Sequence, residues 1–160
     1  MTAPKPITVL FVLTLTGCVD GTAPARGLAG NWRMMSFDGL TVPATYAEFF
    51  DEPVGDRIVE HVIIRLDSAT KVMRPDSTYE RRYFFGELHD GVLVIQYLWG
   101  DHGTFTVGAG AANAIHLTSE YIQNLDTPGI IASSGELHLT EELWIGETPR
   151  STIWAQRQAP

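Results

Sequence analysis

Apolar and polar residues alternate in short runs along most of the chain after residue 28. In residues 57–67, Val62, Ile64 and Leu66 fall on one face of an extended segment, and the residues between them fall on the other. This two-residue period predicts β-strands, and no run shows the period of a long helix. Further strands are predicted at residues 31–37, 70–74, 78–85, 92–99, 104–107, 114–119, 136–143 and 151–157.

Turn residues separate these runs at short intervals. Residues rich in Gly, Asp, Asn, Pro and Ser predict turns at 38–39, 74–78, 89–91, 100–103 and 108–113. Residues 42–50 favour an extended segment, and a short helix that begins near Pro43 is the alternative. Eight or nine strands connected in this way predict an all-β fold, an antiparallel up-and-down meander that closes into a small barrel.

Composition and charge exclude several classes of function. The chain has 160 residues, 44% of them apolar, which is enough for the core of one domain. Its formal net charge of −8 argues against nucleic-acid binding, because phosphates are bound by clustered Lys and Arg. Cys18 is the only cysteine, which excludes an internal disulfide and a cysteine-based zinc site. No cofactor is expected.

The N-terminal segment has a different pattern. Lys5 precedes an apolar run at residues 7–15, which is shorter than the about 20 residues needed to span a bilayer. Leu15-Thr16-Gly17-Cys18 follows and resembles the lipobox of bacterial lipoproteins. The resemblance implies a signal peptide at residues 1–17 and acyl chains on Cys18 that bind the membrane. Alternatives are an ordinary secretory signal and a buried N-terminal strand.

The segments after the lipobox follow from this assignment. Residues 18–27 are predicted to be a lipidated N-terminus and flexible tether, and residues 28–160 the folded domain. Val19, rather than Asp, follows Cys18, so the resemblance favours the outer membrane of a bacterial cell envelope.

Several polar residues are candidates for chemistry, and each has a simpler structural explanation. His116 and His138 stand in similar strands and are candidate metal ligands, but alternation with leucine places them on the solvent face. Asp101-His102 is a candidate acid–base pair, but Gly100 and Gly103 favour a turn at this point. No metal site is predicted.

The serine and glutamate candidates also lack a catalytic context. Ser133-Ser134-Gly135 has neither a Gly-x-Ser-x-Gly context nor an evident base, so a serine hydrolase is not expected. Glu141, Glu142 and Glu147 predict a solvated acidic patch, with a calcium or partner contact as the alternative. No enzyme activity is predicted.

Aromatic residues are the feature most relevant to binding. Alternation places Tyr79, Tyr83 and Phe85 on one face of their strand, and Tyr97 and Trp99 on one face of the next. These side chains either line a site for a small apolar ligand or fill the barrel core.

The domain resembles the bacterial lipocalin-like (calycin-type) lipoproteins from residue 28 to residue 157. The resemblance rests on Gly30-x-Trp32 at the start, the hairpin signal at 75–79, the strand at 103–107, and a last strand with Trp154 and Arg157. A Thr-Asp-Tyr-like turn, the second lipocalin motif, is absent.

The resemblance implies a lipocalin-like barrel that Gly30, Trp32 and Arg157 close, with the arginine stacked over the tryptophan ring. It also implies a lipid-anchored envelope protein that binds a small apolar or amphipathic ligand. The alternative is a structural or interaction lipoprotein with a side-chain-filled barrel, no ligand, and an envelope protein as its partner.

Overall fold

The computed structural model describes residues 27–108, 110–122, 125–143 and 147–157, which form ten β-strands. The strands are β1 (Gly30–Phe37), β2 (Leu40–Thr41), β3 (Ala44–Val54), β4 (Arg57–Met73), β5 (Thr78–His89), β6 (Val92–Val107), β7 (Ala114–Ser119), β8 (Asp126–Ile131), β9 (Leu137–Glu141) and β10 (Arg150–Gln156). The described residues hold no helix with the length and apolar character needed to cross a bilayer.

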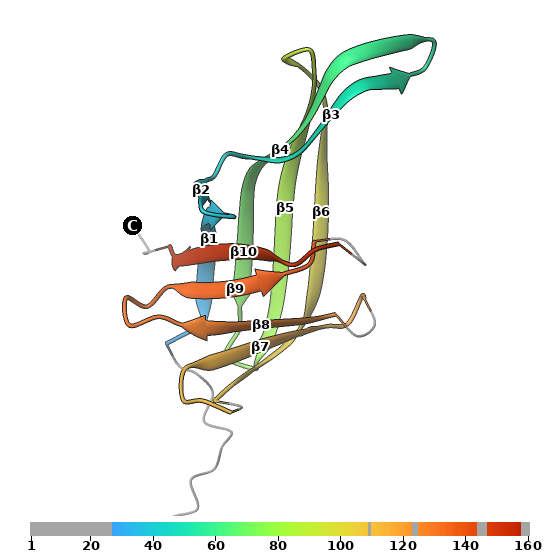
Figure 1. Cartoon of the computed structure of the whole chain (residues 1–160). Helices are drawn as coiled ribbons and strands as arrows, with labels where there is room; N and C mark the ends of the chain where they lie inside the picture. The colour runs from blue at the N-terminus through green and yellow to red at the C-terminus, as the bar shows by residue number, and fades with distance from the viewer. Residues whose placement is uncertain (1–26, 109, 123–124, 144–146, 158–160) are drawn as a thin grey trace, which may run out of the picture.

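Consecutive strands from β3 to β10 pair antiparallel, and β1 closes the sheet. Trp32 on β1 lies opposite Gln156 on β10 and opposite Lys71 on β4, so β1 joins the two ends of the meander. Strands β1 and β4–β10 therefore form a closed eight-stranded ring, in which β7–β10 cross in front of β1 and β4–β6 (Figure 1). The predicted all-β, antiparallel up-and-down barrel is confirmed.

Two strands lie outside the ring. Strand β2 pairs only with the end of β1, and β3 pairs only with β4. The β3–β4 hairpin leaves the barrel and projects beyond it (Figure 1). Residues 42–50 are thus extended, as preferred from the sequence, and Ala44–Val54 is a strand rather than a helical turn.

Some predicted boundaries are wrong. Residues 57–67 and 70–74 belong to one strand, β4, because a bulge between Leu66 and Ser68 changes which residues face inward and interrupts the alternation. Strand β8 was not predicted, because Pro128 and Gly129 weaken its strand pattern.

The turn predicted at residues 100–103 is also wrong, since β6 runs straight through it. A Cβ added at Gly103 would lie 2.0 Å from the Thr118 carbonyl oxygen, and one at Gly100 would lie 3.1 Å from that of Arg81. These glycines permit close approach of the neighbouring strands instead of a turn.

Candidate functional site

Four charged side chains lie inside the barrel, each at most 3% exposed: Lys71 on β4, Arg81 on β5, Asp101 on β6 and Glu141 on β9. Arg81 lies between the two carboxylates, with Nη2 2.9 Å from Asp101 Oδ2 and Nη1 3.0 Å from Glu141 Oε1. The Nζ of Lys71 lies 3.0 Å from the same oxygen of Glu141. Two cations and two anions thus form one neutral ionic network that ties four strands together.

Uncharged donors complete the hydrogen bonding of the two carboxylates. Tyr79 and Ser119 donate to Asp101, and Tyr83, Thr152 and Trp154 donate to Glu141, over distances of 2.6–3.1 Å. The ammonium of Lys71 also lies 4.1 Å from the centre of the Trp154 ring, which is a favourable cation–π position. Each carboxylate therefore has both cationic and neutral donors, as a buried charge requires.

The environment of this network changes the pKa values of Glu141 and Lys71 to different extents. Burial alone would raise the pKa of Glu141, but Lys71, Arg81 and the Thr152 hydroxyl more than offset it and lower the pKa to about 2. Burial lowers the pKa of Lys71 to about 8; repulsion from the nearby Arg81 charge lowers it as well, and attraction to Glu141 offsets only part of this. Glu141 has two cationic neighbours, so its charged form is favoured more strongly than that of Lys71.

The sequence predictions for Asp101 and Glu141 are wrong, because both are buried rather than placed in a turn or a solvated patch. A signal was nevertheless present. Arg81 lies two residues from Tyr79 and from Tyr83, so alternation assigns it to their apolar face. Glu141 likewise extends the face of two buried leucines at 137 and 139. A charge that continues an apolar face predicts a buried partner on another strand.

The five aromatic residues predicted to line a ligand site come together on the inner face of β5 and β6. The rings of Phe85 and Tyr97 stack with their centres 5.3 Å apart, and those of Tyr83 and Trp99 lie 5.1 Å apart. Tyr79, Tyr83 and Phe85 are at most 1% exposed and fill the core, whereas Tyr97 and Trp99 are half-buried.

Gly30 and Trp32 lie at the closing seam of the barrel. Trp32 is 2% exposed, and its indole N–H donates to the carbonyl oxygen of Leu28 over 2.9 Å. Gly30 has a φ of +148°, and a Cβ there would lie 2.5 Å from the amide nitrogen of the Gln156 side chain. Both features explain why a Gly-x-Trp sequence begins this strand.

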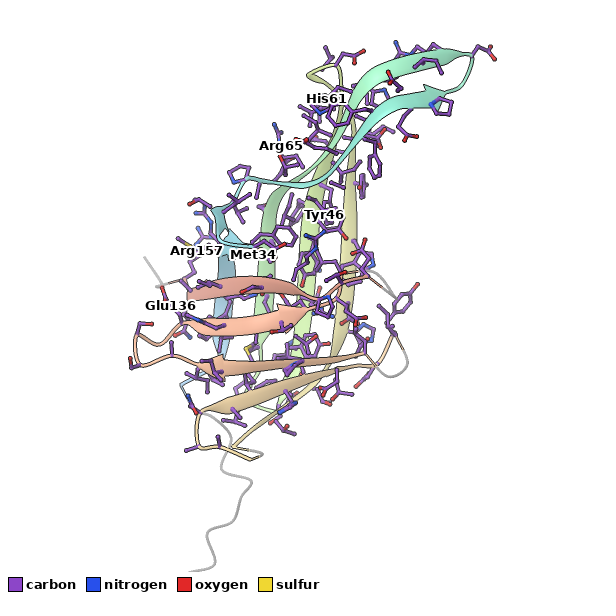
Figure 2. All side chains as sticks on the ribbon, in the orientation of Figure 1. Met34, Tyr46, His61, Arg65, Glu136 and Arg157 are labelled. Atoms are coloured by element: carbon purple, nitrogen blue, oxygen red, sulfur yellow. The ribbon has the colours of Figure 1, made fainter. Side chains whose placement is uncertain are left out.

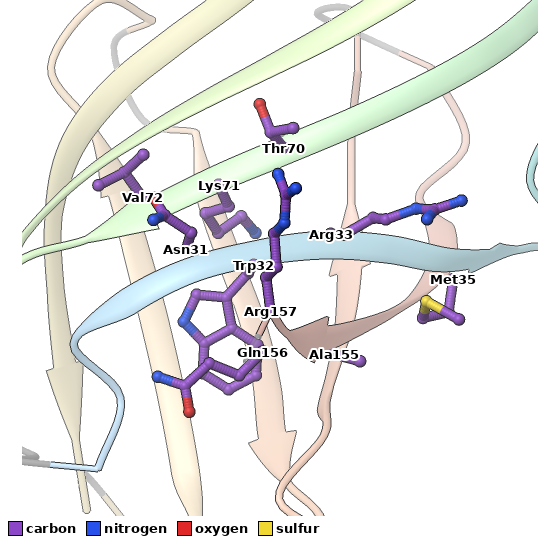
Figure 3. A pocket seen from close by; sticks show the side chains of 10 residues that line it. All are labelled: Asn31, Trp32, Arg33, Met35, Thr70, Lys71, Val72, Ala155, Gln156 and Arg157. Carbon is purple, nitrogen blue, oxygen red and sulfur yellow. The ribbon is translucent and has the colours of Figure 1, made fainter. Parts of the chain in front are cut away.

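The predicted stacking of Arg157 over Trp32 is wrong. Gln156 lies opposite Trp32, so alternation directs Arg157 to the outer face, where it is exposed. Its guanidinium points toward Thr70 across an outer groove of about 650 Å³ where β1, β4 and β10 meet (Figure 3). Arg157 nevertheless contributes to closure, since its backbone N–H donates to the Asn31 carbonyl over 2.7 Å.

The two candidate histidines face outward. The side chains of His116 and His138 are 36% and 41% exposed, and each lies near a single carboxylate. Within the described ranges, no group of three or more His, Cys, Asp or Glu is placed to hold a metal ion. Ser134 donates to Glu136 in an exposed turn, and Glu147 accepts the hydroxyl hydrogen of Tyr46.

A second candidate site is the projecting part of the β3–β4 hairpin, residues 48–61, which we call the arm. Strand β5 ends opposite Val62, so beyond this point the hairpin has only two strands. Phe49, Phe50 and Ile58 are 43%, 64% and 61% exposed on it. The Phe50 ring stacks on His61, which lies on the arm well above Tyr46 (Figure 2). The arm is therefore an exposed apolar surface outside the barrel.

Comparison with protein-family models, with curated proteins and with solved structures gives no match. The lipobox and Cys18 lie outside the described residues.

Proposed function

We propose that this protein is a lipid-anchored cell-envelope protein with a lipocalin-like barrel, and that it binds another envelope protein through the arm. The barrel then serves as a rigid support rather than as a ligand carrier. In this proposal Cys18 carries the acyl chains, and residues 19–27 form the tether between the membrane and the domain.

The filled interior supports a role for the barrel without a ligand. Trp32, Trp154, Arg81 and Tyr83 are among the largest fully buried side chains, and they occupy the space in which a ligand-carrying barrel holds its ligand. Lys71 and Glu141 occupy the same interior with no solvent exposure. An apolar ligand that entered this region would separate charges from their partners at a large energetic cost.

The exposed apolar surface of the arm is the observation that carries the proposal. The arm adds nothing to ring closure, yet it holds two phenylalanines and an isoleucine in solvent. Soluble domains seldom keep three large apolar side chains exposed on one projecting hairpin unless the hairpin binds something. Acidic residues accompany it, including Glu48, Asp51 and Asp56. Their charge disfavours an anionic bilayer and favours a protein surface with basic residues around an apolar centre.

A photo-crosslinking amino acid at position 50, in cells that produce the lipoprotein, tests this function. We expect a discrete protein adduct at position 50 and none at Phe84, which is 39% exposed on the barrel wall and serves as the matched control. Asp56→Lys should weaken the adduct. Equal labelling at both positions, or adducts with lipid alone, would contradict the proposal.

The lipid anchor has its own test. Cys18→Ser should leave the protein unprocessed or move it out of the membrane fraction. Normal processing and membrane retention of this variant would contradict the lipid anchor, but they would not affect the proposed role of the arm.

A second candidate function is binding of a small apolar or amphipathic ligand, and Tyr97 and Trp99 favour it. They are the two inward aromatic side chains of β6 that solvent still reaches. Native mass spectrometry of protein purified from its own cells would show a co-purified ligand, and Trp99→Ala should then release it.

A further inference from the structure

One half of strand β6 has a free edge. Residues 92–104 pair with β5, but pairing with β7 begins only at Gly103. No strand of the described part of the chain pairs with the other side of residues 92–101. Alternate backbone N–H and C=O groups of this stretch therefore point outward, ready to pair with a further strand.

This edge lacks the charges and the proline that usually protect an exposed strand, and its one irregularity is a bulge at Val94, where the pairing with β5 shifts. Residues 92–99 read Val-Leu-Val-Ile-Gln-Tyr-Leu-Trp, without a charge or a proline. Val92, Ile95 and Leu98 are 65%, 49% and 56% exposed. Uncharged, apolar edges of this length are prone to pair with other chains.

Another edge strand of the same sheet, β3, provides a comparison within the molecule. Strand β3 pairs only with β4, and its outer part carries Glu48, Asp51, Glu52 and Pro53. Asp51 also has a positive φ of 54°, which interrupts the regular strand geometry. Charge, proline and local distortion all discourage pairing at an edge. Because β3 carries charges and a proline, and residues 92–99 of β6 carry neither, the β6 edge is the better suited of the two to association.

We propose that the β6 edge pairs with the β6 edge of a second copy of this chain. An antiparallel strand edge is complementary to itself across a two-fold axis, so identical chains need no further adaptation to pair. With the axis at Gln96, Ile95 lies opposite Tyr97 of the second copy.

Charge favours a second copy at β6 and disfavours one at β3. The chain has a formal net charge of −8, so contacts between copies are repulsive wherever acidic residues meet. Residues 92–99 carry no charge and avoid this repulsion, whereas in a β3 pair with its axis at Phe50, Glu48 would lie opposite Glu52 of the second copy. The pairing involves residues outside the arm, so a test of the pairing is independent of a test of the proposed function.

Sedimentation of the full-length chain tests the pairing, with Cys18→Ser as the starting variant so that no acyl chain is present. We expect a dimer, and Ile95→Lys should raise its dissociation constant at least tenfold by placing two ammonium groups near the axis. Ile130→Lys is the matched control: Ile130 is 47% exposed, and β8 pairs with strands on both sides. Residues 1–27 are the same in every variant, so association through them cancels in the comparison.

A second measurement locates the axis. Gln96→Cys in the same background should join two copies through a short bis-maleimide, and Glu48→Cys on β3 should not. A monomer at micromolar concentrations, equal effects of the two lysine variants, or cross-linking at β3 alone would overturn the proposal. So would cross-linking of residue 96 in cells to a different protein alone.

Discussion

Replacing Glu141 by Gln removes the anion that holds Lys71 and Arg81 inside the barrel. Glu141 is fully buried and accepts hydrogen bonds from both cations on Oε1, and from Thr152 and Trp154 on Oε2. A glutamine offers only one oxygen. Its NH₂ group replaces one of the two oxygens, so either the two cations or the Trp154 N–H lose their acceptor.

The expected cost of Glu141→Gln is about 3–5 kcal/mol in the free energy of unfolding, because it leaves buried charges without their partner. Domains of this kind are typically stable by only about 5–15 kcal/mol, so the variant should be close to unfolding. Urea denaturation at pH 7, followed by tryptophan fluorescence, measures the loss. Glu142→Gln is the matched control, since this half-buried neighbour lies outside the network, and its change should stay within about 0.5 kcal/mol.

A second substitution separates charge from packing. In the double variant Glu141→Gln, Lys71→Met, the buried ammonium is gone, and about 2 kcal/mol of the lost stability should return. A loss below about 1 kcal/mol for Glu141→Gln would show that the network does not hold the barrel together. A double variant that is no more stable than Glu141→Gln alone would show the same.

Three further outcomes follow from the same interior. The pKa of Glu141 is about 2 in the fold and 4.5 in the unfolded reference, so its contribution of about 3 kcal/mol should be lost as pH falls from 4.5 toward 2. Equal acid slopes for wild type and Glu141→Gln in pH-dependent urea melts would contradict this. The pKa of Lys71 is lowered from 10.5 to about 8, so the unfolded chain binds more protons between these values and stability should rise with pH there. Lys71→Met should abolish that rise. Finally, Trp32→Ala should cost about 3–5 kcal/mol because the indole is buried and hydrogen-bonded, and an unchanged melting temperature would place Trp32 outside the core.

Local sequence patterns predicted the elements and their connection. Alternation marked most strands, and turn residues marked the hairpins; Asp38 and Gly39, for example, both adopt positive φ between β1 and β2. The antiparallel meander followed because short turns allow only neighbouring strands to pair. Trp32 was placed correctly in the core for a similar reason, because its environment is set largely by its own strand and by Leu28, four residues before it.

The sequence also determined which face each residue occupies, except where a bulge changes the phase of alternation, as it does near Ser68 in β4. Inward-facing Tyr79, Tyr83 and Phe85 were identified in this way. Whether an inward aromatic fills the core or stays accessible depends on its neighbours, however. Tyr83 is covered by Trp154 from β10, whereas β7 does not pair with the part of β6 that holds Trp99.

The ionic network was decided only by the tertiary structure. Glu141 pairs with Lys71 and Arg81, which lie 70 and 60 residues earlier in the chain, and closure of the ring brings these three side chains together. In a single strand, a charged residue at an alternating position normally indicates the solvent face. Only partners on other strands can offset the desolvation cost of burying its charge. The free edge of β6 is likewise a property of the assembled sheet, since it depends on where β7 begins to pair. The sequence therefore determined the strands and their order, while long-range closure determined which charges are buried and which strand edge remains open.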